Sequence, residues 1–464
     1  MRERWIAGSF ILAAGLILFF NLWGRSLENH DYVRHAEVAR EMIRSGEWVV
    51  PHLNGEVYID KPPFVFWLVA LPSSLYGQVT PFLARLPSAL SAWIGVIILF
   101  LWGKRVYGTT SSGLVAGGVL LSCYQYFSQA RLAKTDMVLC LLIILSLYLF
   151  YLGYTGAKKK RYLFYGLSFF FTGLAVLTKG PFGLIGFFIF SLFLIKEGGE
   201  RWWKRWISRE FLLGYTVLAL TVLPWVIFFV GRVGLQESVS LVRENTILSR
   251  HAPFYFYFME IWGHFAPWSI ILPFLFVHLW RRRAEVLKSE EFLFVIWFVA
   301  LFIVLTLFKY RTSRYLLPAL PPLALMIGGM GRGKFKIYLI VFLLAVFSWH
   351  VREFFWIKND LSYSPGKVLT EELQPFIKGA KLFGFRLDIA TKEEINFYLD
   401  PLSPIPMVGK YGRLSEGFEK EGRALALMPK RAYESLRAPE DPSVVVVHRF
   451  RYKKDELVLV SRSP

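Results

Sequence analysis

Long apolar runs recur along the chain, and they constrain its fold more than any other feature. A helix needs roughly 20 apolar residues to cross a hydrocarbon core of about 30 Å. The chain has 464 residues and is 55% hydrophobic, which is too apolar for a soluble domain. The sequence therefore predicts a polytopic α-helical membrane protein with about 11–13 transmembrane helices. The eleven candidate spans lie near residues 7–23, 86–102, 112–129, 137–155, 162–178, 181–195, 211–231, 264–280, 292–308, 315–330 and 337–350.

The charged residues between these runs predict their orientation. If the N-terminus is cytoplasmic, every second loop is cytoplasmic too, and each of those loops is basic, as the positive-inside rule requires. No small-residue cleavage site follows the first run, so we expect an uncleaved helix there. The net charge of +20 reflects these loops. We expect the bilayer, and not nucleic acid, as the partner of these cations, because they form no single patch.

A long outer loop, residues 24–85, interrupts the alternation of spans. Apolar residues at helical spacing predict an amphipathic helix that lies along the membrane surface and ends at Ser45-Gly46. Asn54-Gly55 predicts a turn between two extended pieces. The residues that give the helical spacing are Tyr32, Ala36, Ala39 and Ile43.

The tail differs in character from the rest of the chain. Its apolar runs are short, as in SVVVV and ELVLV, and TKEEINFYL has helical spacing. These patterns favour a small α/β domain. We therefore expect two domains, a transmembrane domain over residues 1–350 and an outer α/β domain over residues 351–464.

Asp31, Arg34 and His35 open the predicted helix of the outer loop. On a helix, Asp31 and His35 lie one turn apart on one face, with Arg34 beside them. Asp is a favoured N-cap, so one interpretation is that Asp31 caps this helix. The other is a carboxylate that binds or deprotonates an acceptor at the membrane surface. The two roles can coexist.

Asp60 and Lys61 stand next to the stiff pair Pro62-Pro63. A residue before proline is pushed towards an extended conformation, and successive side chains on extended backbone point to opposite sides. We therefore expect the two charges to be presented rigidly and separately, with the lysine suited to a phosphate. The alternative is a lysine that merely snorkels at the interface.

Further charges lie where other predicted spans meet the outer face. Asp136 begins one span, and its bland interpretation is a salt bridge with Arg131 or Lys134. Lys179 precedes a Gly-Pro break, where a lysine also suits a helix C-terminus. The positive-inside rule disfavours cations at an outer rim, so an anionic ligand would explain the last group. That group is Lys309, Arg311 and Arg314, followed by Tyr315.

Neither the histidines nor the cysteines predict a metal site. His30, His52, His251 and His264 show no metal-binding spacing. Cys123 and Cys140 both fall in apolar runs and form no disulfide framework. We expect no certain cofactor, although the two aspartates permit a divalent metal without requiring one.

Several motifs taken together resemble a known family. The block HDYVRHAEVAREMIRSGEWVVPHLNGEVYIDKPPFVFWL is similar to the first periplasmic loop of the bacterial lipid-linked-sugar glycosyltransferases. These include the aminoarabinose transferase that modifies lipid A and the dolichyl-phosphate-mannose protein mannosyltransferase-like proteins, all of GT-C fold. RLAKTDM, LTKGP, FAPWSIILP and RYLLPALPPLAL continue the match in order over roughly residues 1–330.

The resemblance implies roles for individual residues. It implies that Asp31 is the acceptor-side aspartate, that Asp136 is a second aspartate of the site, and that Lys61 holds a polyprenyl phosphate. The chain departs from the family pattern at Tyr32, where the family has an acid, and at His35, where it has another aromatic residue. On the donor side the resemblance adds Tyr58, Asp60, Lys179, Arg250 and Tyr315. The rim cation Arg314 is a further donor-side candidate, and Arg34 and His35, beside Asp31, are acceptor-side candidates.

The activity that the resemblance implies is transfer of a sugar from a polyprenyl-phosphate donor, with inversion. The acceptor would be a lipid such as lipid A, a glycan or a protein, on the periplasmic face of a bacterial inner membrane. The alternative is a transporter or flippase of lipid-linked sugars. Midplane charges and broken helices in paired repeats would favour transport, and neither is found in the sequence.

Overall fold

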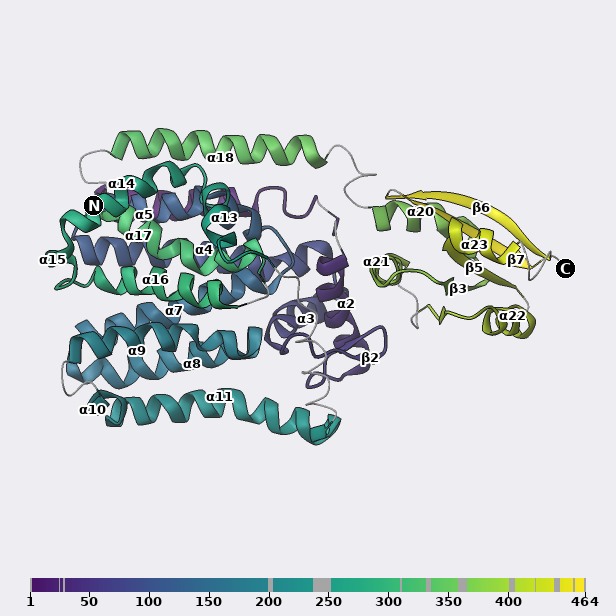
Figure 1. Ribbon diagram of the computed structural model, residues 1–464, viewed down its shortest axis with the longest axis horizontal. Helices are drawn as coiled ribbons and strands as arrows, with labels where there is room; N and C mark the ends of the chain where they lie inside the picture. Colours follow the sequence, from purple (N-terminus) through teal and green to yellow (C-terminus); the bar gives the residue numbers. More distant parts are fainter. Residues whose placement is uncertain are drawn as a thin grey trace.

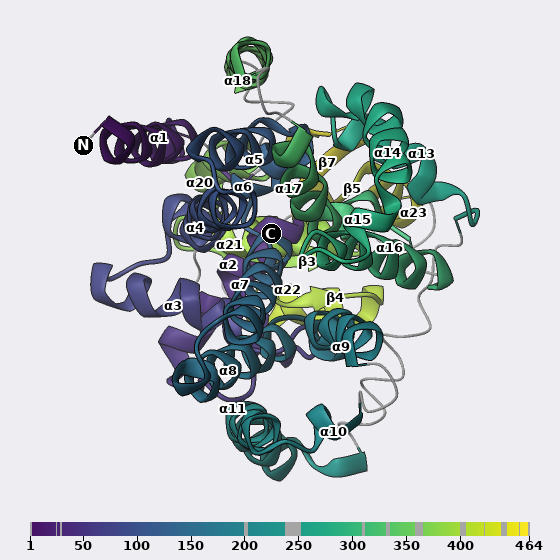
Figure 2. The same cartoon turned by 90° about the vertical axis from the view of Figure 1, so that its left-hand side faces the viewer.

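The computed structural model describes residues 2–24, 26–27, 30–198, 203–236, 252–308, 311–330, 335–357, 365–399, 405–421, 423–437, 443–453 and 455–462. Figure 1 shows a bundle of long helices that run alongside one another, and a smaller domain with a sheet beyond one end of the bundle. Figure 2 looks along the helices from the opposite end. Two short helices of the first outer loop lie between the bundle and the smaller domain (Figure 1).

Helices occupy all eleven of the predicted spans. By length and composition, five helical segments of the described chain can cross a membrane, or six if the bent pair Phe256–His264 and Trp268–Arg281 is one span. One of the five, Lys158–Glu197, contains both α8 and α9. The helices at the predicted spans are α1 (Arg2–Phe19), α4 (Pro81–Tyr107), α5 (Thr110–Ser122), α7 (Thr135–Thr155), α8 (Arg161–Lys179), α9 (Ile185–Gly198), α11 (Arg209–Val233), α14 (Leu272–Arg281), α16 (Phe292–Leu307), α17 (Leu320–Met330) and α18 (Phe335–Ile357).

A tight turn joins α8 to α9 and positions Lys179. This lysine is the last residue of α8, and Gly180 follows it with a φ of 61°. The 3-10 segment η2 (Gly180–Leu184) then returns along α8 so closely that a Cβ on Gly183 would collide with the backbone of Ala175 and Val176. A glycine at 183 is therefore required for this turn.

The first outer loop folds as local sequence rules predict. Helix α2 (His30–Ser45) ends at Gly46, which has a φ of 71°. Strands β1 (His52–Leu53) and β2 (Glu56–Val57) pair antiparallel around a turn at Asn54-Gly55, where both residues have positive φ. This geometry confirms the Asn-Gly turn.

The apolar face of α2 packs against protein. Val33, Ala36 and Ala39 are buried in one cluster with Val69 of α3 (Phe64–Tyr76) and Phe397 of α21 (Ile389–Leu399). Other helices therefore cover this face, and the position of α2 along the membrane surface stays a prediction. The amphipathic pattern reports burial inside the protein, which gives the same periodicity.

The smaller domain confirms the predicted α/β fold of the tail. Its sheet has the order β4-β3-β5-β7-β6; β3 is parallel to both neighbours, and the β5–β7 and β7–β6 pairs are antiparallel. Helices α22 and α23 cover one face of the sheet and α20 and α21 the other. The division at residue 350 itself stays a prediction. The elements are α20 (Pro365–Ile377), β3 (Lys381–Phe385), β4 (Met407–Val408), α22 (Tyr411–Lys420), β5 (Ala424–Pro429), α23 (Lys430–Arg437), β6 (Val444–Tyr452) and β7 (Asp455–Arg462).

Candidate functional site

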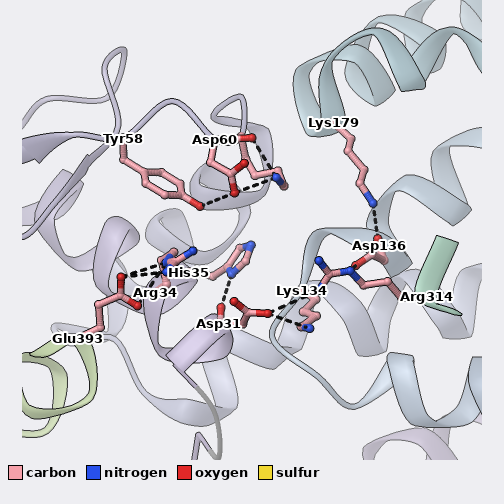
Figure 3. Close-up of polar contacts among 11 residues, drawn as sticks. Asp31, Arg34, His35, Tyr58, Asp60, Lys134, Asp136, Lys179, Arg314 and Glu393 are labelled. Carbon is pink, nitrogen blue, oxygen red and sulfur yellow. Dashed lines mark hydrogen bonds and ion pairs between the residues drawn. The ribbon is translucent and has the colours of Figure 1, made fainter. Parts of the chain in front are cut away.

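The charged residues singled out in the sequence gather where the first outer loop meets the end of the bundle. Figure 3 shows them in two groups, one on the loop and one on the bundle. The loop group is Asp31, Arg34, His35, Tyr58, Asp60 and Lys61, and the bundle group is Lys134, Asp136, Lys179 and Arg314.

Asp136 is the centre of the bundle group. It lies in the first turn of α7 and is only 5% exposed. Its Oδ1 pairs with Lys179 Nζ, and its Oδ2 lies 3.9 Å from Arg314 Nε. The purely structural interpretation of Asp136, a salt bridge with Arg131 or Lys134, is wrong, because Asp136 pairs with Lys179 and Arg314.

Asp31 belongs to the loop group but reaches the bundle group. It is the second residue of α2, so it lies inside the helix and is not the cap that precedes it. Its Oδ2 is 3.4 Å from Lys134 Nζ and 3.5 Å from Arg314 Nη1. Arg314 therefore bridges the two aspartates, Asp31 and Asp136, that the sequence predicted to share one site.

His35 carries a hydrogen bond that fixes its tautomer. Its Nδ1 lies 2.6 Å from the carbonyl oxygen of Asp31, which can only accept, so Nδ1 carries the proton. Burial lowers the pKa of His35 to about 4, and the nearby Lys61 and Lys134 act in the same direction. The imidazole is therefore neutral at pH 7, and its buried Nε2, which has no protein partner within the described residues, presents a lone pair.

Tyr58, Asp60 and Lys61 form one hydrogen-bonded unit. Tyr58 donates its hydroxyl to Asp60 Oδ2 at 3.1 Å, and Lys61 Nζ lies 2.9 Å from the same oxygen and 2.9 Å from the Asp60 carbonyl oxygen. Burial raises the pKa of Asp60, but Lys61 and Tyr58 outweigh burial and hold this pKa below its ordinary value.

This unit corrects the expectation that Asp60 and Lys61 are presented separately. The long side chain of Lys61 folds back onto its neighbour, so the two charges form a pair. The stiff diproline does not stay extended either, because Pro63 has a φ of −80° and a ψ of −12°, which are helical values, at the start of α3.

A cavity of about 990 Å³ lies beside both groups. Its polar wall includes Lys61 from the loop and Lys179 from the α8–α9 turn. Tyr315, in the 3-10 segment η5 (Ser313–Ala319), also lines the cavity, and Lys179 Nζ is 4.0 Å from the centroid of its ring. Most of the remaining wall is apolar, and α9, α11 and α16 contribute Phe188, Trp225, Phe229, Val304 and Leu305 to it.

Glu393 contacts the loop group from another domain, and sequence reasoning missed it. It lies on α21 of the smaller domain, and both of its oxygens accept hydrogen bonds from Arg34, at 3.0 to 3.3 Å. Burial raises the pKa of Glu393, and Arg34 opposes that rise without cancelling it. A signal was available, because Glu393, Asn396 and Phe397 stand at positions i, i+3 and i+4 and so share one helix face.

Two further predictions concern Arg250 and a divalent metal. Arg250 lies outside the described residues. Among the described residues, no group of three or more His, Cys, Asp or Glu side chains is placed to hold a metal ion. Asp31 and Asp136, which the sequence offered as metal ligands, are paired with Lys and Arg side chains instead.

Comparison with known proteins extends the sequence resemblance. Residues 60–228 match the family model described as dolichyl-phosphate-mannose-protein mannosyltransferase. An undecaprenyl phosphate-alpha-4-amino-4-deoxy-L-arabinose arabinosyl transferase of Pseudomonas fluorescens is 25% identical over 70% of this chain and 58% of its own length. An uncharacterised protein of Aquifex aeolicus is 28% identical over 67% of this chain and 61% of its own length. The chain thus spans about three fifths of the curated relatives that it matches.

Solved structures establish the fold. ArnT from Cupriavidus metallidurans in the apo state superposes with a TM-score of 0.82 at 18% identity, covering 99% of this chain and 98% of the other. The same protein bound to undecaprenyl phosphate gives a TM-score of 0.78 at 20% identity, with the same coverage. An archaeal oligosaccharyltransferase from Archaeoglobus fulgidus gives 0.56 at 13% identity, covering 92% of this chain and 70% of the other. The chain therefore shares the GT-C fold of these solved structures, and its sequence is similar to the mannosyltransferase family model and to the arabinosyl transferases.

Proposed function

We propose that this protein is an integral membrane glycosyltransferase. It moves a sugar from a polyprenyl-phosphate donor to a lipid, glycan or protein acceptor on the periplasmic face of a bacterial inner membrane, with inversion. The observation that carries the proposal is the cavity, which combines two lysines with a largely apolar wall. A ligand with a phosphate head and a hydrocarbon tail fits that combination. The arabinosyl transferases among the relatives, and the similar fold of ArnT bound to undecaprenyl phosphate, support the same substrate class.

The lysines of the cavity suit the leaving group. Lys61 holds the donor phosphate, and Tyr58 and Asp60 orient that lysine through the hydrogen bonds described above. Lys179 reaches the cavity from the α8–α9 turn, and its ammonium group lies over the ring of Tyr315. When the bond between the sugar C1 and the phosphate oxygen breaks, its electron pair stays on the phosphate. Fixed cations stabilise that charge as it develops. Arg314, and Arg250 from outside the described residues, complete the proposed cation set.

Asp31 acts on the acceptor side. A hydroxyl acceptor loses its proton to Asp31 while its oxygen bonds to the sugar C1 from the face opposite the phosphate. An acceptor phosphate that is already ionised needs no base. Arg34 and His35, on the same helix, complete the proposed acceptor side. Asp136 holds Lys179 and Arg314 in place, and this anchoring is its proposed catalytic contribution.

The test uses purified protein with radiolabelled undecaprenyl-phosphate sugars and an extract of membrane lipid and protein. The parent is expected to move label off the polyprenyl lipid, and the labelled product names the acceptor. Lys61→Ala should lower the rate by roughly 100-fold or more, the scale seen when one stabilising donor is removed. Asp31→Asn should block transfer to a hydroxyl acceptor.

Lys104→Ala is the matched control. Lys104 sits in the last turn of α4, where it pairs with Glu3 at 2.9 Å, away from the cavity. It should retain the parental rate. Label that stays on the polyprenyl lipid with every sugar tried would contradict the transferase, and movement of intact labelled lipid across vesicles would indicate a transporter instead.

A further inference from the structure

Helix α21 of the smaller domain docks onto the first outer loop through polar contacts. Arg40 of α2 donates hydrogen bonds to the carbonyl oxygens of Asn396 and Phe397, each at 2.9 Å. The side-chain amide of Asn396 donates to Asn54 Oδ1 at the tip of the Asn-Gly turn. Figure 1 shows α21 facing α2 at this junction. The smaller domain is thus tied to the loop that carries half of the candidate site.

Glu393 differs from the other docking residues because it contacts a residue of the candidate site. Its side chain is only 1% exposed, and both of its oxygens accept hydrogen bonds from Arg34. Fork-like pairs between arginine and carboxylate fix orientation as well as distance. Removing one member of a buried pair leaves the other charge uncompensated, so the remaining partner moves.

Contacts continue from Arg34 to Lys61. The guanidinium carbon of Arg34 lies 6.0 Å from the centroid of the Tyr58 ring. Tyr58 donates to Asp60, and Asp60 holds Lys61. Figure 3 shows the labelled members of this chain of contacts, with Glu393 at one end and Asp60 near the other.

We propose that Glu393 is a positioning residue for donor binding: it holds Arg34 against Tyr58 and so determines where Lys61 presents its ammonium group. This inference rests on the proposed function of Lys61. Asp31 also attracts Arg34. Without Glu393, Arg34 turns away from Tyr58, which loosens the hydrogen bonds that hold Lys61. The smaller domain therefore acts on the donor site, although none of its described residues lines the cavity.

The test measures binding of undecaprenyl phosphate, without sugar, to the full-length protein in detergent. Trp225 lines the cavity, so the change in tryptophan fluorescence that is lost in Trp225→Phe reports occupancy. Glu393→Gln keeps the shape of the side chain and removes its charge. We expect its Kd to rise about tenfold, within the range for residues that act through a neighbour. With a transferable sugar donor, KM should rise while kcat changes less than about threefold.

Glu394→Gln is the matched control. Glu394 is the next residue of α21 and is equally buried, but it pairs with Tyr452 at 2.8 Å and Lys453 at 3.0 Å inside the smaller domain. We expect it to lower thermal stability and to leave the Kd unchanged. Equal weakening by both substitutions, or parental affinity in Glu393→Gln, would overturn the proposal.

The parent protein separates this proposal from the proposed function. If the parent binds undecaprenyl phosphate and the two variants differ as expected, the positioning role holds, even where no sugar is transferred and the transferase proposal fails. If the parent does not bind undecaprenyl phosphate, both proposals fail.

Discussion

His35 shows how a single residue takes its chemistry from its surroundings. The hydrogen bond to the Asp31 carbonyl sets its tautomer, and burial keeps it uncharged. The family that the sequence resembles has another aromatic residue at this position, so a ring is retained and a lone pair is added. The helical spacing from Asp31 was predictable, but the burial was not, because it comes from packing against Phe66 of α3 at a ring distance of 5.7 Å.

His35 predicts a measurable pH dependence of stability. The pKa of the folded histidine is about 4, below its ordinary value of 6.5. Between these values the unfolded chain binds a proton that the folded chain does not. The stability contributed by neutral His35 is therefore complete above pH 6.5 and is lost as the pH falls through 4. Going from pH 7 to 4.5, the Tm of the parent should fall about 3 °C further than that of His35→Gln.

His52→Gln is the control for this comparison, because His52 is a half-buried histidine on β1 of the same loop. Its Tm should follow that of the parent across the pH range. Parallel curves for the parent and His35→Gln would show that His35 does not titrate in this window.

Except for Glu393, the members of the site could be found from the sequence, but their partners could not. Asp136, Lys179 and Arg314 each stood out because a charge at the outer end of a span needs an explanation. Their mutual pairing depends on how α7, the α8–α9 turn and η5 pack. The pair of Arg34 and Glu393 is separated by 359 residues, so no local pattern indicated it.

At the scale of elements, local stereochemistry was predictable where glycine or asparagine determined it. The end of α2 at Gly46 and the Asn54-Gly55 turn follow from residues that tolerate positive φ. The extended conformation predicted for Pro62-Pro63 is wrong at Pro63, whose backbone dihedral angles are helical at the start of α3. The amphipathic pattern of α2 suggested contact with the membrane, but its apolar face packs against protein. Such a pattern does not distinguish lipid from protein as the apolar partner.

The α8–α9 turn predicts that Gly183→Ala is disruptive. The added Cβ would strike the backbone of Ala175 and Val176, which is unable to move aside as a flexible side chain would. We expect a Tm lower by several degrees and weaker binding of undecaprenyl phosphate, because Lys179 sits in this turn.

Gly166→Ala, in α8, is the matched control for this substitution. A Cβ there meets nothing within 4 Å, and alanine favours a helix over glycine by about 1 kcal/mol. Its stability should therefore equal or exceed that of the parent. A Gly183→Ala protein as stable as the parent would show that the turn can open.

Across the whole molecule, hydropathy and charge predicted where the helices of the bundle lie. A criterion of helix length alone would have found fewer of them. Helices appear at all eleven apolar runs, whereas five or six segments of the described chain pass a test of length and composition. The others are short or broken, as α14 and α17 are, and broken helices are tolerated where other protein covers their backbone. The loop charges remain the basis of the predicted orientation.

That orientation can be measured with single cysteines. The two natural cysteines, Cys123 and Cys140, are buried, so the parent should react little with a maleimide. Glu56→Cys lies exposed on β2 of the first outer loop, and Lys159→Cys lies exposed just before α8. A membrane-impermeant maleimide should label Glu56→Cys in cells with a permeabilised outer membrane, and Lys159→Cys only after the inner membrane is lysed. The reverse pattern would invert the topology.

The apolar wall of the cavity determines which concentration of the proposed donor controls binding: its concentration in the membrane or that in the bulk sample. Helices α9, α11 and α16, which form much of that wall, are themselves proposed to stand in lipid. A polyprenyl tail that passes from bilayer to cavity exchanges one hydrocarbon setting for another, so hydrophobic transfer contributes little to its affinity. Under this proposal, the protein encounters its donor by diffusion within the plane of the membrane. Its saturation is governed by the mole fraction of donor among the surrounding lipids. Adding inert lipid to the membrane therefore lowers the occupancy of the site, even when the amount of donor per volume of sample stays the same.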